Sequence, residues 1–114
     1  MTLFELYLSD FEEAKKDRYF AENDSRLSER YGHGSFEWFK AMASQYFGGG
    51  YLYHYKNAGI TMQQLREAKE SGLIKYKYYS NWTARHTNRT EWYGLTVKGL
   101  KELYKEYKKG GDEQ

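Results

Sequence analysis

The chain of 114 residues contains no cysteine, which excludes disulfide bonds and thiolate metal sites. It also has no apolar run that approaches the roughly 20 residues of a membrane-spanning helix. The first residues, MTLFELYLSDFEEAKK, lack the basic start of a secretory signal and include the acids Glu5 and Asp10. We therefore expect a cytoplasmic protein with no membrane partner.

The usual core-forming residues are scarce. Leu, Ile, Val and Phe together account for 19 of 114 residues, a level at which a chain can be disordered. The net charge is only +2, however, and 13 Tyr, 6 Phe and 3 Trp supply large apolar surfaces. Rings bury much area each, and tyrosine keeps a polar tip that can stay in water. We expect one folded domain over residues 1–109 with a core built largely from rings, and a disordered tail over residues 110–114.

Charge is distributed unevenly along the chain. Residues 1–37 contain nine acids and five bases, whereas residues 38–109 contain thirteen bases and five acids. Such an imbalance within one domain favours a surface that binds an anionic partner. A random excess of cations on solvated helices accounts for the same counts equally well, so both interpretations stay open at this point.

Capping residues and hydrophobic spacing predict the elements of the first half. A capping box at Thr2–Glu5 predicts a helix from residue 3 to about residue 21, followed by a polar loop. Ser35 caps a second predicted helix, which ends at the glycines 48–50. Residues 51–59 fit a short helix and an extended segment equally well.

The second half predicts a helix, a hairpin and a final helix. The capping box Thr61–Gln64 opens a helix that ends before Gly72. Residues 73–79 alternate as a half-buried strand does, with residues 90–95 as an antiparallel partner, and Thr96 caps the last helix. The predicted fold class is α+β and mostly helical, with about four helices and one β-hairpin.

The predicted hairpin is rich in rings and cations. Cross-strand packing favours core positions for four rings: Tyr76, Tyr78, Trp92 and Tyr93. Trp82 lies beside the tip, where stacking on a base, anchoring a protein partner and folding back over the last helix are all open alternatives. Between residues 75 and 89 the chain has four bases and no acid, which favours contacts with phosphates.

The sequence offers no grouping typical of an enzyme or a metal site. His33, His54 and His86 are far apart, and none has a partner at ligand spacing. The glycines 48–50 are not followed by the Lys-Ser/Thr pair of a nucleotide-binding loop. We therefore predict a protein that is not an enzyme and that uses no metal and no other cofactor.

Two short motifs resemble a known class of regulator. GLI at residues 72–74 and YGLTVKG at residues 93–99 are similar to the "GLI … Y-x-LT-x-x-G" pattern of the multiple-antibiotic-resistance-regulator-like and phenolic-acid-regulator-like families. The resemblance covers roughly residues 60–107. It implies a winged-helix domain for transcription regulation, in which the helix before GLI enters the major groove and the hairpin contacts phosphates or the minor groove. It also implies a homodimer paired through helix one or the Tyr104–Tyr107 end.

This resemblance implies nucleic-acid contacts from both the helix and the hairpin. Glutamine can pair with adenine and arginine with guanine. The helix contributes Gln63, Gln64, Arg66 and Lys69. The hairpin contributes Lys75, Lys77, Arg85, His86, Asn88 and Arg89. The function predicted first is a small DNA-binding regulator of phage or plasmid type.

Two carboxylates favour a second interpretation. Glu67 and Glu70 face outward from the same helix, opposite its buried stripe, where they would repel a phosphate backbone. A protein-interaction module on the same scaffold would use these two residues together with Trp82. Such a module would suit a phage-type, anti-CRISPR-like inhibitor of a host nucleic-acid-handling machine. Double-stranded DNA and a host protein are thus both candidate partners, with DNA preferred.

Overall fold

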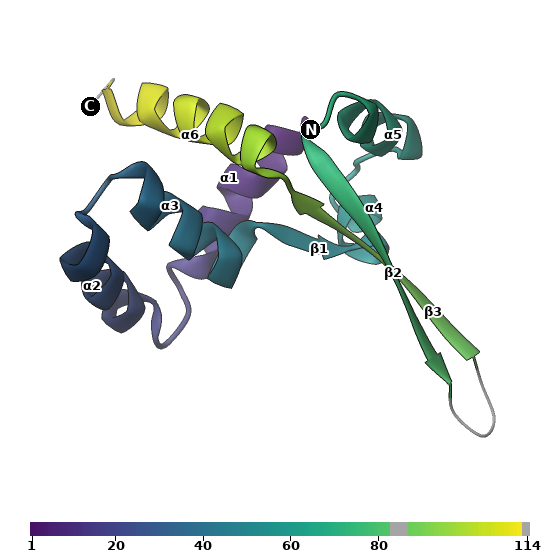
Figure 1. Cartoon of the computed structure of the whole chain (residues 1–114), viewed down its shortest axis with the longest axis horizontal. Coiled ribbons are helices and arrows are strands. Elements are labelled where there is room, and N and C mark those ends of the chain that lie inside the picture. Colours follow the sequence, from purple (N-terminus) through teal and green to yellow (C-terminus); the bar gives the residue numbers. More distant parts are fainter. Residues whose placement is uncertain (83–86, 113–114) are drawn as a thin grey trace.

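The computed structural model describes residues 1–82 and 87–112, with the backbone alone at 79–82, 87–90 and 111–112. Six α-helices, one π-helical segment and a three-stranded antiparallel sheet follow one another along this part of the chain (Figure 1). Their order is α1 (Leu3–Ala14), α2 (Phe20–Tyr31), α3 (Phe36–Met42), η1 (Ala43–Phe47), β1 (Gly49–Tyr51), α4 (Leu52–Asn57), α5 (Met62–Glu70), β2 (Ile74–Trp82), β3 (Thr87–Leu95) and α6 (Val97–Asp112). The predicted α+β, mostly helical class is confirmed. No described helix combines the length and the apolarity that crossing a membrane requires.

The first predicted helix is interrupted. α1 begins with the predicted capping box of Thr2 and Glu5 but ends at Ala14, well before residue 21. α2 then occupies the segment that the sequence predicts as a polar loop, so that prediction is wrong. The buried residues of α2 are Phe20 and Leu27. Because they form so narrow an apolar stripe, periodicity does not reveal this helix.

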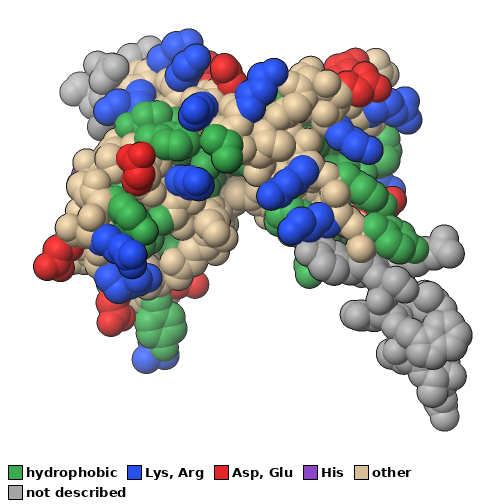
Figure 2. All heavy atoms as spheres, viewed as in Figure 1, with side chains coloured by type: hydrophobic (Ala, Val, Ile, Leu, Met, Phe, Trp, Pro, Cys, Tyr) green, Lys and Arg blue, Asp and Glu red, His purple; other side chains and the backbone are tan. Residues whose placement is uncertain are grey.

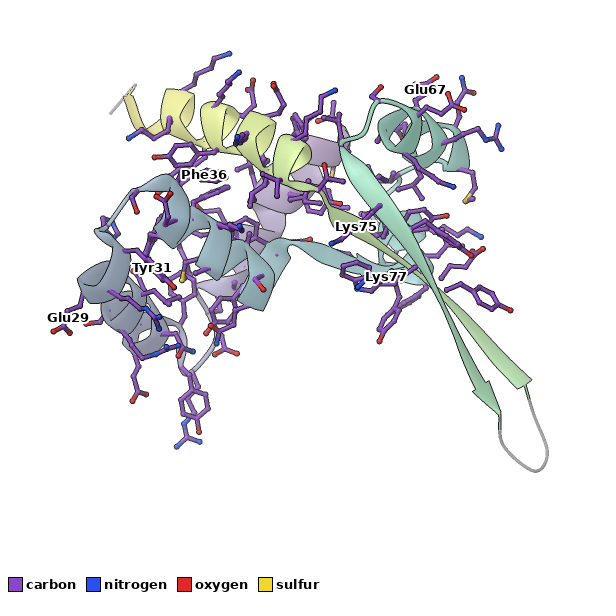
Figure 3. The ribbon with its side chains drawn as sticks, in the orientation of Figure 1. Glu29, Tyr31, Phe36, Glu67, Lys75 and Lys77 are labelled. Carbon is purple, nitrogen blue, oxygen red and sulfur yellow. The ribbon has the colours of Figure 1, made fainter. Side chains whose placement is uncertain are left out.

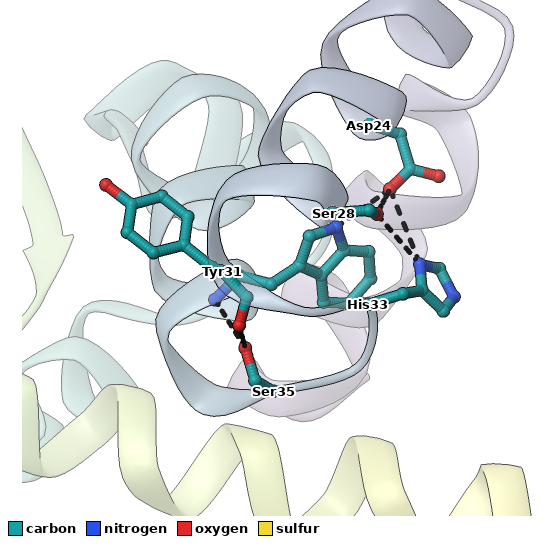
Figure 4. Close-up of polar contacts among 6 residues, drawn as sticks. Asp24, Ser28, Tyr31, His33 and Ser35 are labelled. Atoms are coloured by element: carbon teal, nitrogen blue, oxygen red, sulfur yellow. Dashed lines mark hydrogen bonds and ion pairs between the residues drawn. The ribbon is translucent and has the colours of Figure 1, made fainter.

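A polar network joins α2 to α3 (Figure 4). The indole Nε1 of Trp38 donates to Asp24 Oδ1 at 2.8 Å, and Ser28 Oγ donates to the same oxygen at 3.1 Å. The Nδ1 atom of His33 lies 3.0 Å from Ser28 Oγ. Ser35 Oγ accepts from the Trp38 amide and caps α3, as predicted. Since Trp38 is 2% exposed, its N–H needs this partner, and the bond ties the polar α2 to the core.

The core is built largely from aromatic rings, as the composition predicts. The Phe11 ring of α1 lies 4.8 Å from the Phe47 ring, measured between centroids. From α6, Tyr104 and Tyr107 pack on Phe39 at centroid distances of 5.3 and 5.0 Å. The rings named in the dimer hypothesis therefore pack against their own chain.

The second half runs from β1 through two helices to a hairpin and a final helix. β1 leads into α4, so the ambiguous segment contains a short helix, and the turn at 58–61 connects it to α5. β2 and β3 then form a hairpin that is longer than predicted and that projects from the body of the molecule (Figure 1). β1 pairs with β3, which gives the strand order β1-β3-β2.

The two motif segments meet where α6 begins. Thr96 caps α6 by accepting a hydrogen bond from the Gly99 amide at 3.0 Å, and its hydroxyl donates to the Gly72 carbonyl. Gly72 has a φ of 76°, a conformation that favours glycine. A Cβ on Gly99 would lie 2.0 Å from the carbonyl oxygen of Leu73. The glycines of the motif therefore allow the turn before β2 and the close approach of α6.

A chain of buried tyrosines connects α1, α4 and the sheet. Tyr55 donates from its hydroxyl to the Tyr93 carbonyl at 2.7 Å. Tyr55 has a single hydroxyl proton, so the 2.9 Å bond between the Tyr7 and Tyr55 hydroxyls is donated by Tyr7. Burial raises the pKa of Tyr7 above its usual value and raises the pKa of Tyr55 to about 12. This chain holds α4 against β3 and so positions the helix that follows.

Candidate nucleic-acid interface

The α5 helix carries cations on the side that faces the hairpin. Arg66 and Lys69 are exposed and border a cavity of about 120 Å³ next to Tyr93. The Nζ atom of Lys69 lies 5.3 Å from the centroid of the Tyr76 ring on β2. The structure thus brings two of the predicted α5 contacts together where the helix adjoins the root of the hairpin.

The opposite side of α5 is acidic. Glu67 lines a groove of about 520 Å³ between α5 and α1, and Figure 3 shows this residue on the side of α5 away from the hairpin. Glu5 and Glu106 also line the groove, which is otherwise mainly apolar. Glu70 is exposed but does not line the groove, and it lies one helical turn after Arg66. A phosphate backbone is therefore accommodated better on the hairpin side of α5 than on the groove side.

The two glutamines of α5 have different surroundings. The Oε1 atom of Gln64 accepts from the Thr61 amide at 2.8 Å, and its Nε2 donates to the Met1 carbonyl at 3.2 Å. The oxygen and the nitrogen of this side-chain amide are thus both engaged in hydrogen bonds within the protein. Gln63 is exposed, and its Nε2 donates to Glu67 at 3.0 Å. Of the two, Gln63 is the more exposed, and its amide is engaged with the carboxylate of Glu67.

The sheet has two faces that differ in what covers them, because successive side chains on a strand point to opposite sides. We call the face that packs under α4 and α5 the closed face; by register it carries Gly50, Ile74, Tyr76, Tyr78, Glu91, Tyr93 and Leu95. We call the other face the open face; it carries Gly49, Tyr51, Lys75, Lys77, Trp92 and Gly94. The two faces of the hairpin therefore carry different side chains.

The predicted hairpin cations at the root lie on the open face. Figure 3 shows Lys75 and Lys77 on the side of β2 away from α5. The structure therefore does not bring these lysines together with Arg66 and Lys69, although all four are predicted contacts. On the side of the molecule drawn in Figure 2, Lys and Arg side chains gather over α6 and the hairpin root.

The rings of the hairpin are distributed between the two faces. Tyr93 is 6% exposed and Tyr76 is half-buried, which agrees with their predicted core positions. Tyr78 is 47% exposed, so its predicted core position is wrong. Trp92 is half-buried on the open face and is not among the side chains that pack against the core, so its predicted core position is wrong. Its neighbour Tyr93 occupies the closed face, and strand residues alternate.

The predicted contacts at the hairpin tip lie outside the described side chains. They are Trp82, Arg85, His86, Asn88 and Arg89. At Trp82, Asn88 and Arg89 the backbone is described, as part of β2 and β3. The roles assigned to these five residues stay predictions.

Sequence reasoning missed the contribution of β1 to the open face. Tyr51 pairs in register with Trp92, and Gly49 pairs with Gly94. β1 has three residues, which are too few for alternation to be recognised. No family model matches the chain, and no curated protein or solved structure matches it either. The function is therefore inferred from the placement of its own side chains.

Proposed function

We propose that this protein is a small winged-helix DNA-binding regulator whose α5 docks on duplex DNA. The proposal rests on one observation: Arg66 and Lys69 lie next to each other on the hairpin side of α5, and both are exposed. In winged-helix complexes the helix before the hairpin enters the major groove, and the hairpin contacts the adjoining backbone. Cations at the junction of these two elements are therefore in position to contact phosphates.

The exposed surface of α5 also supports contact with bases. Arg66 has the planar donor pair that matches guanine, and Gln63 has the amide that matches adenine. Both side chains are exposed. Glu67 lines the groove between α1 and α5, so its carboxylate lies farther from the hairpin than Arg66 and Lys69 do, and Gln63 must release Glu67 to contact a base.

Salt-dependent binding of a labelled duplex, measured by fluorescence anisotropy, tests this proposal. We expect affinity to fall steeply with salt, since each phosphate contact releases counterions. Replacing both cations (Arg66→Gln with Lys69→Gln) should lower the slope of log affinity against log salt by about 1.8, or about 0.9 per contact. The pair Lys40→Gln with Lys101→Gln removes the same charge from exposed positions on α3 and α6, and it serves as the matched control.

The absence of duplex binding at low salt would contradict the proposal, as would equal slopes for the two double variants. The pair Arg85→Ala with Arg89→Ala extends the measurement to the hairpin tip. If the tip contacts phosphates, this pair also lowers the slope by about two contacts.

The groove between α1 and α5 favours a second candidate function, binding to a protein. Its lining is mainly apolar, and Glu5, Glu67 and Glu106 supply negative charge. Such a groove suits an apolar side chain flanked by lysine or arginine on a partner. In the same duplex assay, Glu67→Lys should leave affinity unchanged or raise it if α5 binds DNA. If the protein is instead a protein-binding module, neither the wild type nor Glu67→Lys should bind the duplex.

A further inference from the structure

A row of three side chains crosses the open face. Lys77, Trp92 and Tyr51 are register partners on β2, β3 and β1. Neighbouring strands lie about 4.8 Å apart, so the ammonium, the indole and the phenol are adjacent across the sheet. Tyr51 is 53% exposed, and Lys77 is exposed as well. This face thus presents two aromatic side chains and a cation to solvent.

Trp92 rests on a floor of two paired glycines. Gly49 and Gly94 are register partners in the next row of the open face. A Cβ on Gly49 would lie 2.3 Å from Cζ2 of Trp92, and a Cβ on Gly94 would lie 2.0 Å from its Cη2. The six-membered ring of the indole therefore covers both glycines in close contact with the backbone. Side chains at these positions would lift the ring, so the glycines let it lie low on the sheet.

We propose that the open face binds single-stranded nucleic acid, with a base stacked on Trp92 and with Lys75 and Lys77 on the adjoining phosphates. Aromatic side chains on an exposed sheet surface stack on unpaired bases of any sequence. Lysines beside the ring add attraction to the backbone. Among the described side chains of the sheet, this face carries no carboxylate.

Carboxylates beyond β1 determine how the bound nucleic acid is oriented on the open face. A groove of about 710 Å³ adjoins Trp92 and Tyr51, and α1 and the turn after it contribute three carboxylates and one cation to its lining: Asp10, Glu13, Asp17 and Lys16. Lys16 pairs with Glu13 and His54 with Asp10, so acids exceed lysines on this side. Phosphates are repelled from this side and attracted to the lysine side. The backbone of the bound strand therefore follows β2, and its bases point across β3 toward β1.

The contact between Lys77 and Trp92 is compatible with entry of a base. The Nζ atom of Lys77 lies 5.8 Å from the centroid of the Trp92 ring, which is a weak interaction for an ammonium that remains exposed to solvent. The flexible ammonium can move from the ring to a phosphate when a base takes its place. An acidic protein would match the lysines but not the exposed rings, whereas a single strand matches both.

This site is separate from the proposed duplex site, since α5 packs against the closed face. The two activities therefore fail independently. Arg66→Gln with Lys69→Gln should weaken duplex binding and leave single-strand binding unchanged. Changes at Trp92, Lys75 and Lys77 should do the reverse.

Anisotropy of a fluorescein-labelled oligothymidine of about 12 nucleotides tests the proposal at low salt, with an oligouridine arm to distinguish DNA from RNA. We expect binding in at least one arm and a loss of about tenfold or more in Trp92→Leu, as removal of a stacking ring produces. Lys75→Gln with Lys77→Gln should lower the salt slope by about 1.4, at about 0.7 per contact for a single strand. Tyr53→Ala is the aromatic control, because Tyr53 is 71% exposed on α4, outside the open face.

The fluorescence of Trp92 provides a second measurement, which does not require a change to the open face. In a Trp82→Phe chain, the remaining indoles are Trp38, which is 2% exposed, and Trp92. Stacking of a base should therefore quench the emission of Trp92 on titration with the oligonucleotide. Lack of binding in both arms overturns the proposal, as does wild-type affinity of a folded Trp92→Leu chain or binding without quenching. An acidic protein as the true occupant would give the first of these results.

Discussion

The closed and open faces of the sheet use aromatic residues in opposite ways. On the closed face, the Tyr93 ring lies 5.9 Å from the Tyr55 ring and 5.3 Å from the Tyr76 ring, between centroids. On the open face, Trp92 rests on glycines and Tyr51 reaches solvent. Both faces of the sheet carry aromatic rings, so the difference in their burial comes from the elements that cover each face. On the closed face, helices cover Tyr93 and make it part of the core. On the open face, none of the described helices covers Trp92, which lies flat on two glycines with its other side toward solvent.

The largest expected effect comes from removing the ring at the centre of the closed face. Tyr93→Ala should lower the free energy of unfolding by about 3–5 kcal/mol, because it leaves a cavity under α4 and α5. Tyr51→Ala on the open face should change it by no more than about 0.5 kcal/mol. Urea denaturation followed by circular dichroism measures both, and similar losses for the two variants would show that the faces do not differ.

Alkaline pH should weaken the hydrogen-bonded tyrosines behind the closed face. Burial raises the pKa of Tyr55 to about 12 and also raises that of Tyr7, whereas both titrate near 10 in an unfolded chain. As pH rises, the unfolded state loses its protons first. Stability is then constant below about pH 10 and falls above it by about 1.4 kcal/mol per pH unit for each tyrosine.

Urea unfolding between about pH 8 and pH 11 measures this loss. Tyr7→Phe is the matched control, since it removes one titrating group and keeps the bond from Tyr55 to the Tyr93 carbonyl. Its stability should fall less steeply with pH than that of the wild type. A stability that does not change up to about pH 11 would contradict the raised pKa values.

A smaller loss than that of Tyr93→Ala is expected from a change at the paired glycines under Trp92. Gly94→Ala should destabilise the fold by about 1–3 kcal/mol, because the new Cβ displaces the Trp92 ring. In a Trp92→Ala background the same change should cost much less, since the clashing ring is gone. The double-mutant cycle of unfolding free energies measures this coupling. Additive effects would show that the ring does not rest on Gly94.

Helix starts could be predicted from the sequence because a cap depends on a few neighbouring residues. The predicted caps are confirmed at Thr2, Ser35, Thr61 and Thr96. α2 could not be predicted in the same way. Its anchor is the bond between Asp24 and Trp38, residues on different helices, and its own sequence is mostly polar.

Only those features of the candidate site that depend on neighbouring residues in the sequence could be predicted. Alternation indicated the hairpin, and the capping box indicated α5 with its cations. Which face of the sheet α5 covers is a tertiary property, so the separation of Lys75 and Lys77 from Arg66 could not be foreseen. Tyr51 belongs to a strand that forms only when Gly49 pairs with β3.

The strand order β1-β3-β2 leaves β2 at an edge of the described sheet. An edge strand offers backbone donors and acceptors with which another molecule's strand can pair, and charged side chains discourage that pairing. Lys75 and Lys77 place charge along this edge. We expect the two lysines to discourage such pairing, so they would favour solubility even if the surface beside them bound nothing.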